Sequence, residues 1–125
     1  MAETQDSLTL IASQVRACEK CKLHATRKKA VPGDWPENAK IMFIGEGPGF
    51  HENEQGKPFV GAAGKFLDEL LASIGMKRAN VFITNVIKCR PPQNRDPELD
   101  ELRACDGYLQ RQIALINPKV IVTLG

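Results

Sequence analysis

The chain has 125 residues, of which 42% are hydrophobic and 26% charged, so it is long and apolar enough for one domain with its own core. Its 17 Lys and Arg and 15 Asp and Glu leave a net charge of +2, which is too small to indicate a nucleic-acid partner by itself. No apolar run approaches the ~20 residues of a membrane span, and the polar N-terminus is unlike a signal peptide. We therefore expect a cytoplasmic protein with no membrane partner.

The first part of the chain predicts a helix and then a loop. Apolar residues recur at helical spacing within residues 7–16, and Asp6 or Ser7 can cap that helix. Residues 22–39 are irregular by their turn residues, which include the run Pro32-Gly33-Asp34-Trp35-Pro36. The apolar face of the helix consists of Leu8, Ile11, Ala12 and Val15.

Two strands and a helix are predicted next. The continuous apolar run at 40–44 is typical of a strand buried on both faces of a parallel sheet. A long loop over 45–61 leads to a helix over 62–73, with Gly75 at the position of a left-handed C-terminal cap. Residues 81–85 form the second strand. The apolar positions of the helix are Phe66, Leu67, Leu70, Leu71 and Ile74.

The last part of the chain completes an alternating pattern. A loop over 86–96 is followed by a helix that we expect to open at Asp96-Pro97 and to stop at Asn117-Pro118. Residues 120–124 are the third strand. The order of one helix and then βαβαβ predicts a single α/β domain over 1–125, with a parallel sheet and helices on both faces. Because Gly125 follows a strand directly, we expect this domain to continue in a longer protein.

The four cysteines suggest a metal centre. Cys18 and Cys21 form a C-x2-C pair, Cys89 lies in a predicted loop, and Cys105 lies in the helix after it. A reducing cytoplasm disfavours disulfides, which leaves a structural zinc ion, an iron–sulfur cluster or unrelated free thiols. Spacing alone does not separate these three alternatives.

The glycine-rich turn Gly45-Glu46-Gly47-Pro48-Gly49 follows the first strand. It matches neither a dinucleotide fingerprint nor a phosphate-binding P-loop, because the spacing of the later glycines is wrong for both. Asn85 ends the second strand. Since ligands bind at the carboxyl ends of parallel strands, we expect these segments to line one crevice.

Three segments together resemble family 4 uracil-DNA glycosylases, enzymes that carry a 4Fe–4S cluster. They read GEGPG at 45–49, GKPFVGAAG at 56–64 and NVIKCRPP at 85–92, and the cysteine positions also fit that family. The resemblance implies a three-layer α/β/α fold. It also implies an enzyme that hydrolyses the N-glycosidic bond of deoxyuridine in DNA after the nucleotide flips into the crevice. Separately, we expect the protein to be a monomer.

The resemblance also implies residue roles. Phe59 stacks on uracil, Asn85 reads its Watson–Crick edge, and Glu52 sits near C5, where it obstructs a thymine methyl group. Glu46 and Gly47 line the position of the attacking water. The 4Fe–4S ligands are Cys18, Cys21, Cys89 and Cys105. The cluster is expected to fix the 86–105 segment, whose side chains for DNA phosphates are Lys88, Arg90 and Arg95.

One part of the family pattern is missing from this sequence. The family carries a His-Pro motif after its third strand, and this sequence ends before such a motif. We therefore expect cluster binding and part of the pocket here, with the activity of these 125 residues alone left open. The alternative function is a non-catalytic iron–sulfur or zinc module that docks onto DNA or a polymerase.

Overall fold

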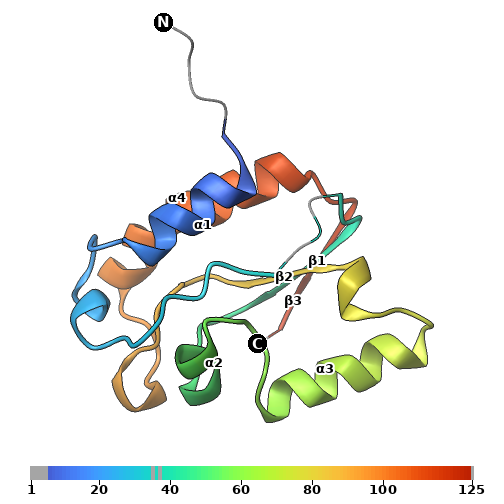
Figure 1. Ribbon diagram of the computed structural model, residues 1–125, viewed down its shortest axis with the longest axis horizontal. Helices are drawn as coiled ribbons and strands as arrows, with labels where there is room; N and C mark the ends of the chain where they lie inside the picture. Colours follow the sequence, from blue (N-terminus) through green and yellow to red (C-terminus); the bar gives the residue numbers. More distant parts are fainter. Residues whose placement is uncertain (1–5, 35, 37, 125) are drawn as a thin grey trace, which may run out of the picture.

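The computed structural model describes residues 6–34, 36 and 38–124, and three parallel strands form its centre in the order β2-β1-β3. The strands are β1 (Ile41–Gly45), β2 (Phe82–Asn85) and β3 (Val120–Thr123). The α-helices are α1 (Leu8–Arg16), α2 (Phe50–Gln55), α3 (Ala62–Ser73) and α4 (Leu99–Ile116). Helices α1 and α4 lie on one side of the sheet, and α2 and α3 lie on the other (Figure 1). The predicted α/β fold with a parallel sheet is thus confirmed.

Each face of the sheet has its own apolar core. Met42 and Ile44 of β1 belong to the cluster formed with α1 and α4, whereas Ile41 and Phe43 pack against the cluster formed with α3. Successive strand residues point to opposite faces, so a run that is apolar at every position is buried from both sides. The outer strand β3 differs, because Val120 is 50% exposed at the edge of the sheet.

The helix predicted at the N-terminus is correct in its limits and in its buried face. Ser7 caps it, with its Oγ accepting a hydrogen bond from the Leu10 amide at 3.0 Å. All four residues of the predicted apolar stripe are buried: Leu8, Ile11, Ala12 and Val15.

The start of α4 was predicted too early. The helix begins at Leu99 with Glu98 as its N-cap, rather than at Asp96-Pro97. The carboxylate of Glu101 accepts a hydrogen bond from the Glu98 amide at 2.8 Å, which caps the helix from inside its first turn. The predicted end is correct, since Asn117 adopts the left-handed conformation with φ of 48°.

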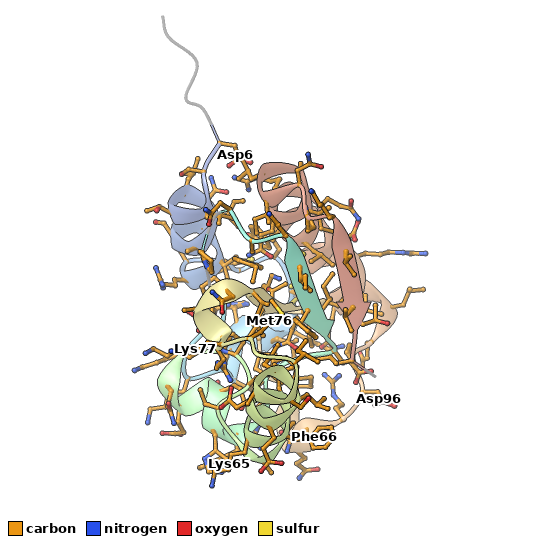
Figure 2. All side chains as sticks on the ribbon, turned by 90° about the vertical axis from the view of Figure 1, so that its right-hand side faces the viewer. Asp6, Lys65, Phe66, Met76, Lys77 and Asp96 are labelled. Atoms are coloured by element: carbon orange, nitrogen blue, oxygen red, sulfur yellow. The ribbon has the colours of Figure 1, made fainter. Side chains whose placement is uncertain are left out.

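Helix α3 buries less of its apolar surface than its spacing suggests. Leu67 and Leu71 are buried, and Gly75 is left-handed after the helix as expected. The neighbouring apolar side chains of α3 remain exposed: Phe66 by 61%, Leu70 by 45% and Ile74 by 66%. Figure 2 shows Phe66 on the outer side of this helix.

Short helical segments interrupt the predicted loops. Helix α2 lies inside the expected 45–61 loop, and its six residues are too few for a periodic signal. Three 3₁₀ turns are likewise too short to show a period in the sequence: η1 (Lys22–Ala25), η2 (Arg78–Asn80) and η3 (Pro92–Asn94). Of the helices that the structure describes, none combines the length and apolarity needed to cross a membrane.

Candidate functional site

The carboxyl ends of β1 and β2 bring the glycine-rich turn beside Asn85. Gly45 and Asn85 are direct partners in the parallel register. The pairing continues beyond the strands, because the Val86 amide donates to the Gly45 carbonyl at 2.9 Å and the Ile87 amide donates to the Glu46 carbonyl at 3.1 Å. The crevice expected at this edge of the sheet is therefore formed by these two segments.

A narrow slot of about 80 Å³ opens at this edge. Asn85 lies in its wall with 2% exposure, and its Oδ1 is the one buried side-chain polar atom in the described part of the chain with no hydrogen-bond partner. Buried polar atoms without partners are costly, so this oxygen is set up for a donor from a ligand. The slot is lined by Gly47, Glu52, Phe59, Ala63 and Asn85.

Phe59 is held in the slot by an unusual backbone. Its φ is +52°, which is rare for an aromatic residue. The guanidinium of Arg78 donates to the carbonyl oxygens of Phe59 at 2.6 Å and Pro58 at 2.7 Å. A Cβ at Gly64 would collide with the Phe59 backbone. Arg78 thus positions the ring that closes the slot, a role that no pattern in the sequence indicated.

Glu52 lines the slot and also braces the same loop. Its carboxylate accepts hydrogen bonds from the amides of Gly49, Val60 and Gly61 at 2.9–3.0 Å. Burial alone would raise the pKa of Glu52, but these hydrogen bonds outweigh it and lower that pKa below its ordinary value. The carboxylate is therefore ionised at neutral pH and ties α2 to the Phe59 loop.

A wider cleft of about 300 Å³ adjoins the slot and shares Gly47, Glu52 and Ala63 with it. Glu46 lines this cleft and is exposed. Asn94 lies in the same wall, where it accepts a hydrogen bond from Nε of Arg90 at 2.8 Å. The structure thus brings Glu46 and Gly47 to one cavity and adds Asn94, to which the sequence assigned no role.

The expectation for Lys88 is corrected by its burial. Lys88 is 1% exposed, and its Nζ donates to Thr84 Oγ1 at 2.6 Å, to the Asn85 carbonyl at 2.6 Å and to Gln112 Oε1 at 2.9 Å. The amino group, whose pKa burial lowers to about 7, is satisfied inside the protein and does not face a DNA phosphate. It links the end of β2 to α4 instead.

The two arginines expected to face DNA are closer to the surface. Arg90 is half-buried, with its guanidinium carbon 5.5 Å from the ring centre of Phe50. Arg95 lines the cleft, but both of its terminal nitrogens donate to the carboxylate of Glu101 at 2.8 Å. Arg95 therefore has a structural partner as well as a place in the cleft.

The Arg95–Glu101 pair predicts a stability that depends on pH. The Glu101 side chain is 0% exposed, and hydrogen bonds from Arg95 outweigh burial and lower its pKa from 4.5 to about 2. A carboxyl whose pKa is lower in the folded state stabilises the fold above pH 4.5, and this stabilisation is lost as pH falls towards 2. We expect Glu101→Gln to reduce the free energy of unfolding by about 3 kcal/mol at pH 7 and by much less near pH 2.

Urea unfolding at several pH values measures this difference. Glu69→Gln removes the same charge from an exposed position on α3 and should leave the pH dependence unchanged. Curves for Glu101→Gln and the unchanged protein that run parallel from pH 7 to pH 2 would contradict the assignment.

The four cysteines gather at one apolar site beside α1 and α4. All are free thiols; Cys89 and Cys105 belong to the buried cluster, and Cys18 and Cys21 pack against it. Burial, with a smaller contribution from the nearby Cys105 and Cys21, raises the pKa of Cys89 to about 11 against the opposing effect of Arg27. In residues 6–34, 36 and 38–124, no three His, Cys, Asp or Glu side chains are placed to hold a single metal ion.

The surroundings of the thiols suit an anionic iron–sulfur core. Arg27 donates to Cys89 Sγ at 3.1 Å, and the Lys20 amide donates to Cys18 Sγ at 3.5 Å. Such donors stabilise cluster-bound sulfur. Four Cys thiolates are a ligand set used by zinc ions and by 4Fe–4S clusters alike. The residues present are therefore chemically suited to a cluster.

Comparisons with known proteins agree on one family. The sequence model described as "Uracil DNA glycosylase superfamily" matches residues 32–125. The chain is 60% identical over 121 residues to a type-4 uracil-DNA glycosylase of Saccharolobus solfataricus, covering 96% of this chain and 56% of that protein. It is 58% identical over 121 residues to the type-4 enzyme of Sulfurisphaera tokodaii, covering 96% of this chain and 55% of the relative.

A third relative is the type-4 uracil-DNA glycosylase of Archaeoglobus fulgidus, which is 54% identical over 120 residues, covering 96% of this chain and 60% of that protein. The chain thus spans little more than half the length of these relatives.

Proposed function

The chain belongs to the uracil DNA glycosylase superfamily, and from this premise we propose that the protein removes uracil from DNA by hydrolysing the N-glycosidic bond of deoxyuridine. The observation that carries the proposal is the buried, unpartnered Oδ1 of Asn85, which lies in a slot closed by the ring of Phe59. To reach a buried amide in such a slot, the nucleotide must leave the base stack, which costs a few kcal/mol.

Base recognition follows from the amide of Asn85. Its oxygen accepts from N3–H of uracil, and its nitrogen donates to O4. Cytosine reverses both groups and would leave a buried donor facing a donor, which a site of this kind rejects strongly. Stacking on Phe59 adds roughly 1–3 kcal/mol and does not depend on the base. Glu52 beside the ring is proposed to obstruct the methyl group of thymine.

The N-glycosidic bond of the flipped nucleotide is proposed to break in the wider cleft that adjoins the slot. A water oxygen bonds to C1′ of the sugar, the C1′–N1 bond breaks, and its electron pair leaves with uracil. Glu46, which is exposed in that cleft beside Gly47, is proposed to orient the water and to favour the positive charge that develops on the sugar. The water proton passes to this carboxylate or to solvent. Stabilisation of opposite charges where they form is the main source of rate enhancement in such reactions.

We propose that Arg95, which lines the cleft, and Arg90, which donates to Asn94 in the cleft wall, contact DNA phosphates near the flipped nucleotide. The protein is proposed to act as a monomer in the cytoplasm, where its substrate would be found. A binding module without activity is the alternative function, and the enzyme assay below separates the two.

Cleavage of a uracil-containing oligonucleotide tests the function. The intact protein should produce alkali-sensitive abasic sites in a strand with one uracil and none in the same strand with thymine or cytosine. Intact protein that binds this DNA but leaves uracil in place would refute the glycosylase and favour the binding module.

We also propose that Cys18, Cys21, Cys89 and Cys105 hold a 4Fe–4S cluster. Four thiols at one apolar site, with Arg27 donating to one of them, support this assignment. Hydrolysis moves no electrons, so the cluster is not needed as a redox centre. When bound, it would instead link the N-terminal segment to α4 through its cysteine ligands. These residues thus hold the 86–105 segment that carries Asn94 and Arg95 to the cleft.

Removal of one ligand tests the cluster. Cys105→Ser should abolish the visible iron–sulfur absorbance of anaerobically purified protein and lower its melting temperature, because the link to α4 is broken. Arg27→Lys is a control that keeps the charge beside the thiols and should keep the colour. Colourless protein that contains zinc and no iron would contradict the cluster, because zinc has a filled d shell.

A further inference from the structure

A large basic hollow lies apart from the slot and the cleft. It measures about 670 Å³. The end of α1, the η1 turn and the chain after it form one side, and the end of α2 forms the other; in Figure 1 the α1 end and the light-blue turn lie at the left. Its lining consists of Arg16, His24, Arg27, Lys28, Lys29, Ala30, Gln55, Gly56 and Lys57.

The hollow concentrates positive charge in a chain that is almost neutral. Five of the 17 Lys and Arg side chains line it, and no Asp or Glu does, while the whole chain carries only +2. In the described part of the chain, one of the five has a carboxylate partner, through the pair of Lys28 Nζ with Glu54 at 2.5 Å. Arg27 donates to the neutral Arg16 carbonyl at 3.1 Å and to Cys89. Most of this charge is therefore uncompensated.

The side chain of Asn53 holds the backbone of the basic segment in place. Asn53 of α2 is buried, and its Oδ1 accepts from the amides of Lys28 at 2.8 Å and Lys29 at 3.4 Å. This amide ties the basic segment to α2, which in turn carries Glu52 to the slot. The hollow thus has a fixed position relative to the slot.

The separation of the two sites fits neighbouring nucleotides. Helix α2 has six residues and is about 9 Å long at about 1.5 Å per residue. Its first turn borders the slot, and Gln55 and Gly56 at its end border the hollow. Lys57 is only two residues from Phe59. A strand that left the slot and crossed α2 would meet the hollow within a few nucleotides.

We propose that this hollow binds phosphates of the DNA strand that flanks the flipped nucleotide. Arg16, Lys28, Lys29 and Lys57 are exposed and spread around an open hollow, which suits a chain of phosphates better than one small anion. Binding of this kind releases counterions and depends steeply on salt. The choice of DNA as the ligand rests on the proposed function, whereas the charge and shape of the site do not.

A charge-removal variant tests the proposal in the intact protein. In Arg16→Gln/Lys29→Gln/Lys57→Gln, we expect affinity for a fluorescent uracil-free duplex to fall about 10- to 100-fold at low salt. The slope of log affinity against log salt should become shallower by about 2 to 3, near 0.9 for each phosphate that the variant no longer neutralises. Arg27 is left unchanged because it donates to Cys89.

The matched control removes the same charge elsewhere. Lys65→Gln/Lys77→Gln/Lys119→Gln changes three exposed lysines, of which Lys65 and Lys77 lie on the α3 side of the molecule seen in Figure 2. Affinity and slope should stay close to those of the unchanged protein. Equal effects of the two triple variants, or no effect of either, would overturn the proposal. Uracil-free DNA makes the result independent of excision, so failure of the glycosylase assay leaves this test intact.

Discussion

Replacing Asn85 with alanine should lower kcat/KM for uracil excision roughly 10³-fold, because the variant cannot form either hydrogen bond to the Watson–Crick edge in this buried site. The side chain is 2% exposed and its Oδ1 has no partner among the described residues. No hydrogen bond within the described part of the chain depends on that oxygen, so its removal should cost little stability. Affinity for uracil-free DNA should change by less than about threefold, since phosphate contacts dominate that affinity.

Excision rates and DNA anisotropy measured on the same preparations test the role of Asn85. Gln110→Ala is the matched control, because Gln110 is exposed on α4 and its amide donates to Asp106 of the same helix. It should leave excision unchanged. Equal reductions of excision and of DNA affinity in Asn85→Ala would show that Asn85 does not read the base.

A methyl group at Gly45 should be almost as damaging as the removal of the Asn85 amide. A Cβ at Gly45 would stand 2.5 Å from Asn85 Oδ1 and 2.5 Å from Phe59 Cζ, so it would force apart the two residues proposed to hold uracil. Displacement of a reacting or recognising group by about 1 Å costs on the order of 10²-fold in rate. We expect Gly45→Ala to lower kcat/KM by at least about 10²-fold and stability by about 1–3 kcal/mol.

Excision assays and thermal unfolding of Gly45→Ala measure both effects. Gly107→Ala provides the control, because a Cβ at Gly107 on α4 would meet no atom within 4 Å. That change should raise stability by roughly 0.5–1 kcal/mol through helix propensity and leave excision unaltered. Excision by Gly45→Ala at the rate of the unchanged protein would contradict the proposed slot.

Long elements with a clear period were predicted well. Residues 7–16 and 62–73 show helical spacing, and 40–44 shows the continuous apolar run of a doubly covered strand; each forms the expected element. Helix α2 was not predicted, since six residues between glycines carry no period. The start of α4 was misplaced because Asp96-Pro97 is a good local cap signal, and Glu101, held by Arg95, caps the Glu98 amide instead.

The sequence indicated which side chains meet at the carboxyl edge of the sheet, but not all of their surroundings; their roles stay predictions. Glu52, Phe59 and Asn85 come together as the strand ends and the resemblance suggested. Lys88 was misplaced because a lysine is exposed by default, and only the three acceptors from Thr84, Asn85 and Gln112 make its burial possible. The clamp of Arg78 on Phe59 joins residues nineteen apart through backbone carbonyls, which leave no mark on the sequence.

The order of helices and strands, the parallel sheet and the segments that meet at its carboxyl edge could all be inferred from the amino acids alone. Periodicity and turn residues are local properties, and the direction of strands in βαβ units follows from chain connectivity. The folded chain was needed to reveal that Lys88 turns inward, that Glu52 braces the Phe59 loop, and that Arg16, Lys29 and Lys57 share one hollow. Burial and charge compensation are set by neighbours distant in the chain, and those neighbours exist only once the chain has folded.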